Sequence, residues 1–275
     1  MTIVRQRGRR ATRFVKLEGA GNDFVLVDHR SKSGRNPSQP EIRWLLDRHR
    51  GVGGDGLLLL LDPTEGNDVE VRYWNADGEP AEFCGNGARC VAHHLFTADP
   101  STQTLRFRLG RVEVEAKRSR EGRIDIRHPM PRILTLPQQG PRVPAGVNPV
   151  WIDSGVPHWL LPVRAVDAFD LPTWGPMIRS HPSLGPRGTN VDAIEIGPEW
   201  IRVRSWERGV EGETQACGSG LLAAAFWAWR VLGREFPLEL RSRSGDRFEA
   251  SLAENEGGIW LEGPARTVFA GAVDF

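Results

Sequence analysis

The alternation of apolar and polar residues predicts a chain built mainly of short strands. In the first half, strands at residues 14–18 and 24–28 flank the turn Gly19-Ala-Gly-Asn22 and form a hairpin. Two further strands are predicted at 57–61 and 69–74. A strongly alternating run then predicts a three-stranded meander at 104–109, 111–117 and 123–127.

Helices are few, and two of them begin in the same way. Residues 38–48 are predicted to be helical, with Pro40 in the first turn, where a missing N–H is harmless. Apolar helical runs follow Cys84-Gly-Asn-Gly87 and Cys217-Gly-Ser-Gly220. A short helix is predicted near 174–179.

The second half repeats the order of the first. Strands are predicted at 150–152, 158–163, 191–196 and 200–206 before the second cysteine helix, and at 237–241, 246–252 and 258–262 after it. The two cysteines lie 133 positions apart, close to half the chain. This order predicts an internal duplication, with two similar α/β domains facing each other across a cleft.

The Pro- and Gly-rich segment 129–146 is typical of a linker or domain crossing. We therefore expect a first domain of residues 14–127 plus 264–275 and a second domain of residues 128–263. Residues 1–13 carry five arginines and no acid, so they are predicted to be a disordered basic leader. A signal peptide is not favoured because no apolar segment follows, and a transit peptide is not favoured because the segment is short and lacks serine.

Composition narrows the class of protein. The net charge of +1 gives no indication of nucleic-acid or anionic-membrane binding, and no run approaches the roughly 20 apolar residues of a membrane span. Three cysteines far apart make a poor disulfide framework and indicate a reducing, cytoplasmic compartment.

The cysteine motifs permit a specific chemistry. A thiol at a helix N-terminus is placed to become a thiolate, because free N–H groups and the helix dipole favour negative charge there. The small residues that follow let a ligand approach the backbone, and the first-turn N–H groups form an anion site for a carboxylate. Two such thiols indicate a two-base reaction, in which one thiolate removes an α-proton and one thiol returns a proton to the opposite face.

Other interpretations of these residues remain. Either cysteine could be a small buried hydrophobe, and Cys90 inside the first helix is expected to be a core residue. A zinc site from Cys84, Cys90, His93, His94 and Cys217 lacks the usual ligand spacing. The segment Gly51-Val-Gly-Gly-Asp-Gly56 lacks the lysine of a phosphate loop and follows a predicted helix rather than a strand.

Polar residues stand at matched positions before each motif. Asn75 ends a strand nine residues before Cys84, and Arg208, beside Glu207, lies nine residues before Cys217. These residues either reach the rim of the cleft or cap strand ends in water. His158 begins a predicted strand, where a lone histidine is more often structural than catalytic.

With these motifs the chain resembles the diaminopimelate epimerase family from Phe14 onward. The resemblance is carried by Gly19-Ala-Gly-Asn-Asp-Phe24, Gly51-Val-Gly-Gly-Asp-Gly56, Asn75-Ala-Asp-Gly78, Cys84-Gly-Asn-Gly-Ala-Arg-Cys90, Gly188-Thr-Asn-Val191 and the segment from Glu207 to Gly220. It implies two pseudo-symmetric domains, each a curled, mostly antiparallel sheet around a central helix, with the active site in the cleft between them.

The resemblance also implies residue roles. Cys84 and Cys217 are expected to be the two bases, supported by His158 and Glu207. The expected substrate contacts are the backbone near Gly85, Asn86, Gly218 and Ser219 for the reacting carboxylate, and Asn22, Asn75, Asn190, Glu207 and Arg208 for the distal amino-acid end.

The expected reaction is the interconversion of LL- and meso-diaminopimelate without cofactor or metal, in lysine and peptidoglycan precursor synthesis. The expected partner is this small molecule, and a homodimer is one assembly we consider. Val156 stands where many members have asparagine, and Gly56 where some have glutamine. The alternatives are therefore a racemase of another amino acid, such as histidine, and a non-catalytic redox sensor that joins Cys84 to Cys217.

Overall fold

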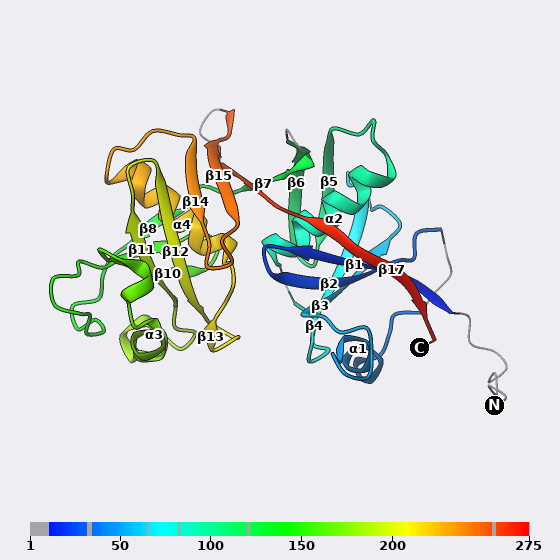
Figure 1. Cartoon of the computed structure of the whole chain (residues 1–275), viewed down its shortest axis with the longest axis horizontal. Coiled ribbons are helices and arrows are strands. Elements are labelled where there is room, and N and C mark those ends of the chain that lie inside the picture. The colour runs from blue at the N-terminus through cyan, green and yellow to red at the C-terminus, as the bar shows by residue number, and fades with distance from the viewer. Residues whose placement is uncertain are drawn as a thin grey trace. The chain divides into compact units, whose positions relative to one another are not determined.

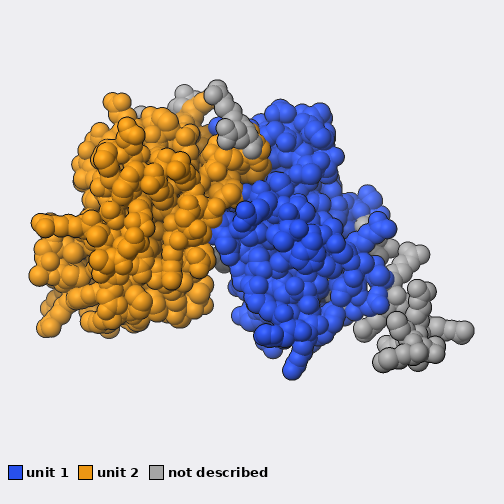
Figure 2. All heavy atoms as spheres, in the orientation of Figure 1, with its two compact units in different colours: residues 1–118, 265–275 blue, residues 119–264 orange. Residues whose placement is uncertain are grey.

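A computed structural model describes residues 11–31, 35–64, 66–81, 83–119, 122–254 and 257–274 (Figure 1). The chain divides into two compact units, Met1–Arg118 with Ala265–Phe275 and Ser119–Pro264 (Figure 2). Residues 1–10 of the expected basic leader lie outside the described residues. Thr12 and Arg13, the end of that leader, belong instead to the first strand, where Thr12 pairs with Val273.

Unit 1 holds a sheet whose strands pair in the order β17-β1-β2-β3-β4-β5-β6. The pairs β2–β3 and β4–β5 are parallel and the others antiparallel. The elements are β1 (Thr12–Gly19), β2 (Asn22–Asp28), α1 (Gln39–Leu46), β3 (Gly56–Leu61), β4 (Val69–Asn75), α2 (Gly85–Ala98), β5 (Thr104–Leu109), β6 (Val112–Arg118) and β17 (Arg266–Val273).

Unit 2 pairs its strands in the order β8-β9-β10-β11-β12-β14-β15-β16-β7, with β13 beside β12. The elements are β7 (Ile124–His128), β8 (Arg132–Leu134), β9 (Val150–Asp153), β10 (Pro157–Pro162), η2 (Val166–Ala168), α3 (Leu171–Arg179), η3 (Pro182–Leu184), β11 (Asn190–Ile196), β12 (Trp200–Glu207), β13 (Gly212–Glu213), α4 (Gly218–Arg230), β14 (Leu238–Arg241), β15 (Arg247–Leu252) and β16 (Ile259–Gly263).

The pairing confirms the predicted duplication. The series β1–β2 antiparallel, β2–β3 parallel, β3–β4 antiparallel, β4–β5 parallel recurs as β9–β10, β10–β11, β11–β12, β12–β14. Parallel neighbours need a crossover connection, and the helices α1, α2, α3 and α4 supply the four crossovers. The two cysteine helices, α2 and α4, are therefore equivalent elements of the repeat.

Each cysteine helix is the centre of its unit. Every residue of α4 from Gly220 to Ala228 is buried, and the helix packs against strands on several sides, among them β10, β12, β14 and β16. A helix that is apolar all round must be enclosed, because no face of it can remain in water at low cost. The mostly antiparallel sheet therefore curls around the helix, and the same holds for α2 against β1, β2 and β6.

Three segments differ from the sequence-based expectation. The expected linker 129–146 contains β8, which pairs with β9. Strand β7, expected in the first domain, pairs with β16 inside unit 2. Strand β17 was not predicted, because nearly all its side chains are exposed and it joins the sheet through backbone hydrogen bonds to β1. Among the described residues, none of the helices has the length and apolarity to cross a membrane.

Candidate active site

Cys84 is the N-cap residue of α2. Its backbone is extended, and its Sγ accepts a hydrogen bond from the Gly87 N–H at 3.5 Å. The thiol therefore satisfies one of the free donors of the first helical turn, as a capping serine would. Cys84 is partly exposed, so a small molecule from solution can reach it.

The hairpin turn of β1 and β2 brings Asn22 to the same sulfur. Ala20 and Gly21 both have positive φ, 54° and 84°, which gives a two-residue turn and makes Asn22 the first residue of β2. Asn22 Nδ2 donates to Asp55 Oδ2 at 2.6 Å, so its Oδ1 is left facing Cys84 Sγ and Asn86 Nδ2, each at 3.5 Å. The thiol of Cys84 is thus surrounded by neutral amides.

Asn86 is held from the opposite side. Arg89 is fully buried and donates through Nη2 to Asn86 Oδ1. This bond directs the Asn86 amide nitrogen towards Asn22 and fixes the first turn of α2.

Asn75 is positioned by the neighbouring tyrosine. Tyr73, on β4, donates its hydroxyl to Asn75 Oδ1 at 3.0 Å. A Cβ placed on Gly56 would lie 2.6 Å from Tyr73 Cε2 and 2.9 Å from the Trp74 carbonyl oxygen. The tyrosine ring therefore occupies the space that a side chain at position 56 would need.

Cys217 stands at the start of α4 but in a different setting. It is buried, at 6% exposure, and its Sγ lies 3.4 Å from Ser219 Oγ. Burial, together with the negative charges of Glu207 and Asp192, raises the pKa of Cys217 well above its ordinary value. The described state therefore favours the thiol.

Glu207 is the carboxyl group in contact with that thiol. Burial raises its pKa, and hydrogen bonds from Thr214 and Cys217 offset part of this effect. Thr214 donates its hydroxyl to Glu207 Oε1, which leaves the other oxygen available to the sulfur. A carboxyl group with a raised pKa beside a thiol is suited to exchange a proton with it.

His158 reaches Cys217 through Ser219. The imidazole is fully buried; its Nδ1 lies 2.6 Å from Asp192 Oδ2 and its Nε2 lies 2.9 Å from Ser219 Oγ. Asn190 Nδ2 is 3.2 Å from the same Nε2. His158 and Asn190 are register partners of the parallel pair β10–β11, which explains their contact.

Two of the residues expected to hold the distal end of the substrate, Asn190 and Arg208, contact each other in unit 2. The Arg208 backbone N–H donates to Asn190 Oδ1 at 2.8 Å, so the Asn190 amide is engaged at both ends. Val156 lies in the turn between β9 and β10, where its carbonyl accepts from the Ser154 N–H. Ser154 Oγ in turn donates to the Ser219 carbonyl, so this turn is anchored to the start of α4.

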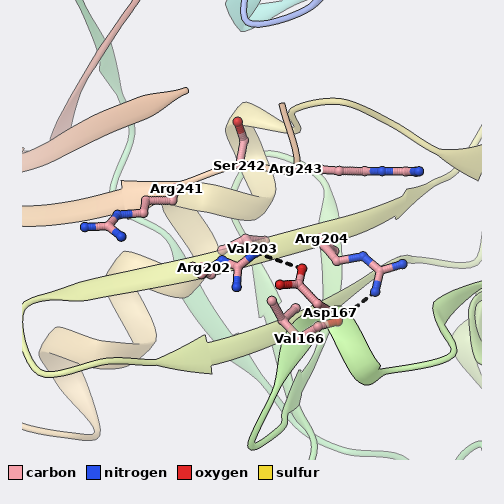
Figure 3. A pocket seen from close by; sticks show the side chains of 8 residues that line it. All are labelled: Val166, Asp167, Arg202, Val203, Arg204, Arg241, Ser242 and Arg243. Atoms are coloured by element: carbon pink, nitrogen blue, oxygen red, sulfur yellow. Dashed lines mark hydrogen bonds and ion pairs between the residues drawn. The ribbon is translucent and has the colours of Figure 1, made fainter. Parts of the chain in front are cut away.

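A separate hollow in unit 2 is lined by arginines (Figure 3). Its lining consists of Val166, Asp167, Arg202, Val203, Arg204, Arg241, Ser242 and Arg243. Each guanidinium has a carboxylate partner: Asp167 for Arg202, Glu213 for Arg204 and Arg243, and Glu239 for Arg241. Each of the four guanidiniums is thus ion-paired, with Glu213 shared between two of them, and the lining includes none of the cysteine-site residues.

The structure thus gathers several of the predicted residues into one set in each unit, while Asn75 is held by Tyr73. Unit 1 joins Cys84, Asn86 and Asn22, and unit 2 joins Cys217, Ser219, His158, Asn190 and Glu207. Sequence reasoning missed Asp55, Tyr73 and Asp192. The signal for Asp192 was present, because an acid between Val191 and the apolar pair Ala193-Ile194 needs a buried partner.

Solved structures share this fold. A phenazine biosynthesis protein of the PhzF family from Bacillus anthracis superposes with a TM-score of 0.72 at 14% identity, over 97% of this chain and 100% of that one. A hydroxyproline epimerase from Agrobacterium vitis gives a TM-score of 0.67 at 15% identity, over 98% and 94%. This chain, with its two compact α+β units, therefore has the fold of these two proteins.

Comparison with known sequences identifies the protein family. The diaminopimelate epimerase family model matches residues 14–127 and 150–268. Diaminopimelate epimerase from Chlorobaculum tepidum is 37% identical, over 94% of this chain and 99% of its own length; that from Aquifex aeolicus is 34% identical, over 94% and 96%. This chain belongs to the diaminopimelate epimerase family and is an isomerase.

Proposed function

We propose that this chain interconverts LL- and meso-diaminopimelate, with Cys84 and Cys217 as its two acid–base groups. The observation that carries the proposal is the placement of one thiol at the start of the central helix in each half of a duplicated fold. The near-full-length similarity to curated diaminopimelate epimerases supports the substrate. The reaction would supply lysine and peptidoglycan precursors in the cytoplasm.

The proposed chemistry follows from the surroundings of the two thiols, Cys84 and Cys217. One sulfur takes the α-proton as a thiolate while the other gives a proton to the opposite face as a thiol, and the roles exchange in the reverse direction. The substrate carboxylate would accept N–H bonds at the first turns of α2 and α4, near Gly85, Asn86, Gly218 and Ser219, where helix N-termini favour negative charge. This arrangement calls for neither pyridoxal phosphate nor a metal.

Recognition of the other amino-acid centre is assigned to Asn22, Asn75, Asn190, Glu207 and Arg208. A guanidinium such as that of Arg208 suits bidentate pairing with a carboxylate. Unequal distal contacts would let the enzyme invert one centre and leave the other unchanged.

The test replaces each cysteine by alanine and measures both epimerisation of LL-diaminopimelate and deuterium uptake at the α-carbon. Loss of a proton-transfer group costs about 10²–10⁴-fold, so both variants should lose nearly all turnover. Cys90→Ala is the matched control, because Cys90 is a fully buried thiol in the same helix as Cys84 and should not change turnover. Full activity in either the Cys84 or the Cys217 variant would refute the two-base assignment.

A second candidate is a racemase of another amino acid, favoured by one observation. Val156 brings an apolar side chain to the β9–β10 turn, which is anchored to the Cys217 helix through Ser154 and Ser219. Steady-state rates over a panel of amino acids decide between the two. Turnover of histidine or proline without turnover of LL-diaminopimelate would establish the second candidate.

A further inference from the structure

Asp192 is a buried carboxylate with both oxygens engaged. It sits on β11, fully enclosed, among Val191, Ala193 and Ile194. Its Oδ2 meets His158 Nδ1 at 2.6 Å, and its Oδ1 accepts from the Ser205 hydroxyl at 2.5 Å. Ser205 is its register partner on β12, so the sheet itself fixes this contact.

The carboxylate is also packed against the helix that carries the catalytic thiol. A Cβ added to Gly220 would lie 2.6 Å from Asp192 Oδ1 and 2.9 Å from Ser205 Oγ. The first turn of α4 therefore rests directly on Asp192. Enclosing a carboxylate costs free energy unless it is paired and hydrogen-bonded, and groups held in this way concentrate at functional sites.

The tautomer of His158 follows from the hydrogen bonds around it. The Arg208 backbone N–H can only donate, so the atom of Asn190 that it meets must be the carbonyl Oδ1. Asn190 therefore turns its NH₂ group towards His158 Nε2, which must accept. The ring proton then lies on Nδ1 and is donated to Asp192, as in other imidazoles oriented by a carboxylate.

The accepting nitrogen faces the route to Cys217. With Nε2 accepting, Ser219 can donate its hydroxyl to it at 2.9 Å, and the Ser219 oxygen, 3.4 Å from Cys217 Sγ, can accept the S–H when that proton turns away from Glu207. The chain of hydrogen bonds thus runs from sulfur to hydroxyl to imidazole to carboxylate.

We infer that Asp192 is a positioning residue of the epimerase reaction, which holds His158 in the Nδ1–H tautomer so that Nε2 can exchange a proton with Cys217 through the Ser219 hydroxyl. The inference rests on the proposed role of Cys217. In the forward step, the thiol proton passes to Ser219 Oγ while the Ser219 proton passes to Nε2. The step leaves a thiolate and an imidazolium, the imidazolium facing the Asp192 carboxylate, and the reverse step restores both neutral groups.

Asn190 and Asp192 act on His158 in opposite senses. The amide NH₂ of Asn190 favours an unprotonated Nε2 and keeps the imidazole ready to accept. The Asp192 carboxylate stabilises the imidazolium once it forms, because opposite charges in close contact attract strongly away from water.

The test is Asp192→Asn, which preserves shape and removes the charge. We expect kcat to fall by about 10²-fold, the cost of impairing an acid–base group, while KM stays within about 3-fold. Ser205→Ala is the matched control: it removes one hydrogen bond to Asp192 but leaves the carboxylate and its contact with His158, so kcat should stay within about 10-fold.

A second measurement needs no stable variant at position 192. Nitrogen NMR of the wild-type protein labelled in histidine, with the His158 signals assigned by their loss in His158→Asn, reports which ring nitrogen carries the proton. We expect Nδ1–H in the wild-type chain and a shift towards Nε2–H in Asp192→Asn. Wild-type kcat in Asp192→Asn, or an Nε2–H ring in the wild type, would overturn the inference. Failure of Cys217→Ala to lose activity would instead overturn the proposed function.

Discussion

The starts of α2 and α4 are equivalent in backbone and unequal in chemistry. Each helix follows an extended N-cap cysteine, and each forms the crossover connection between two parallel strands of its unit. Cys84 is partly exposed, caps its helix and meets the neutral amide of Asn22. Cys217 is buried beside Glu207 and the Ser219–His158 chain.

This difference matters because a two-base reaction starts from one thiolate and one thiol. An N–H group at a helix N-terminus stabilises negative charge, and each cysteine has one, from Gly87 at Cys84 and from Gly220 at Cys217. Burial and nearby carboxylates oppose negative charge, as at Cys217. We infer that Cys84 loses its proton more readily than Cys217; in the described state the Cys84 S–H still donates to Asn22 Oδ1 at 3.5 Å. Duplication supplied two equal positions, and the surrounding side chains made them complementary.

Among the changes that test this comparison without removing a cysteine, the largest effect should come from removing the carboxyl group next to Cys217. Glu207→Gln preserves shape but cannot exchange a proton, so kcat should fall by about 10²-fold in steady-state assays. The same change should raise thermal stability at neutral pH. Because burial raises the pKa of Glu207 above 4.5, the folded state holds this proton more tightly than the unfolded state. The free energy of unfolding therefore falls as the pH rises from about 4.5 through the raised pKa of Glu207 in the folded state. Glutamine does not ionise, so it removes this loss of stability.

Glu213→Gln is the matched control for that change. Glu213 is a buried glutamate on the neighbouring strand β13, paired with Arg204 at 2.6 Å and Arg243 at 3.0 Å. Its loss leaves the partly buried guanidinium of Arg204 without its carboxylate partner, so the melting temperature should fall while kcat changes little. If Glu207→Gln loses stability and retains kcat, as expected of Glu213→Gln, then Glu207 is a structural residue and the comparison of the two cysteines fails.

The second prediction concerns thiol reactivity. With limiting iodoacetamide at neutral pH, Cys84 should be alkylated first, since the thiolate is the nucleophile and each pKa unit changes the thiolate fraction about tenfold. Cys217 should react at least about 10-fold more slowly. Cys90 is fully buried, its pKa is raised by burial, and it should react only after unfolding. Mass spectrometry of peptides over time gives the three rates. Equal rates for Cys84 and Cys217 would contradict the inference that Cys84 loses its proton more readily than Cys217.

The sequence predicted the elements well where side chains decide them. Strand β4 alternates Val69, Val71 and Tyr73 on its buried face as expected, and both cysteine helices begin where their motifs indicate. It did not predict β8 and β17, whose exposed side chains carry no apolar pattern and whose backbones simply complete a sheet. Whether a segment at a sheet edge forms a strand depends on the strand it pairs with, and that strand is far away in the sequence.

The candidate site was predictable to the same extent. The cysteines, His158 and Glu207 follow from motifs, whereas Asp192 contacts His158 from the adjacent strand and Tyr73 contacts Asn75 on its own strand. Asp192 meets His158 because β10 and β11 pair in parallel with His158 opposite Asn190. The spacing of residues along the chain does not reveal how two strands pair, so this register could not be predicted from the sequence. Gly56 is explained in the same way, by a ring that arrives from β4.

The smallest predicted effect tests the amide side of the comparison. Tyr73→Phe removes the hydroxyl that holds Asn75 Oδ1 and leaves the ring packed beside Gly56. A neutral hydrogen bond contributes about 1 kcal/mol, so KM for LL-diaminopimelate should rise about 5-fold while kcat changes little, because no proton moves through this contact. In an Asn75→Ala background the same tyrosine change should have little further effect on KM, since the hydroxyl is expected to act on substrate through Asn75. A fall in kcat comparable to that of Glu207→Gln would show that unit 1 also supplies proton-transfer groups beyond Cys84, and the contrast between an amide-lined and a titratable cysteine would then be wrong.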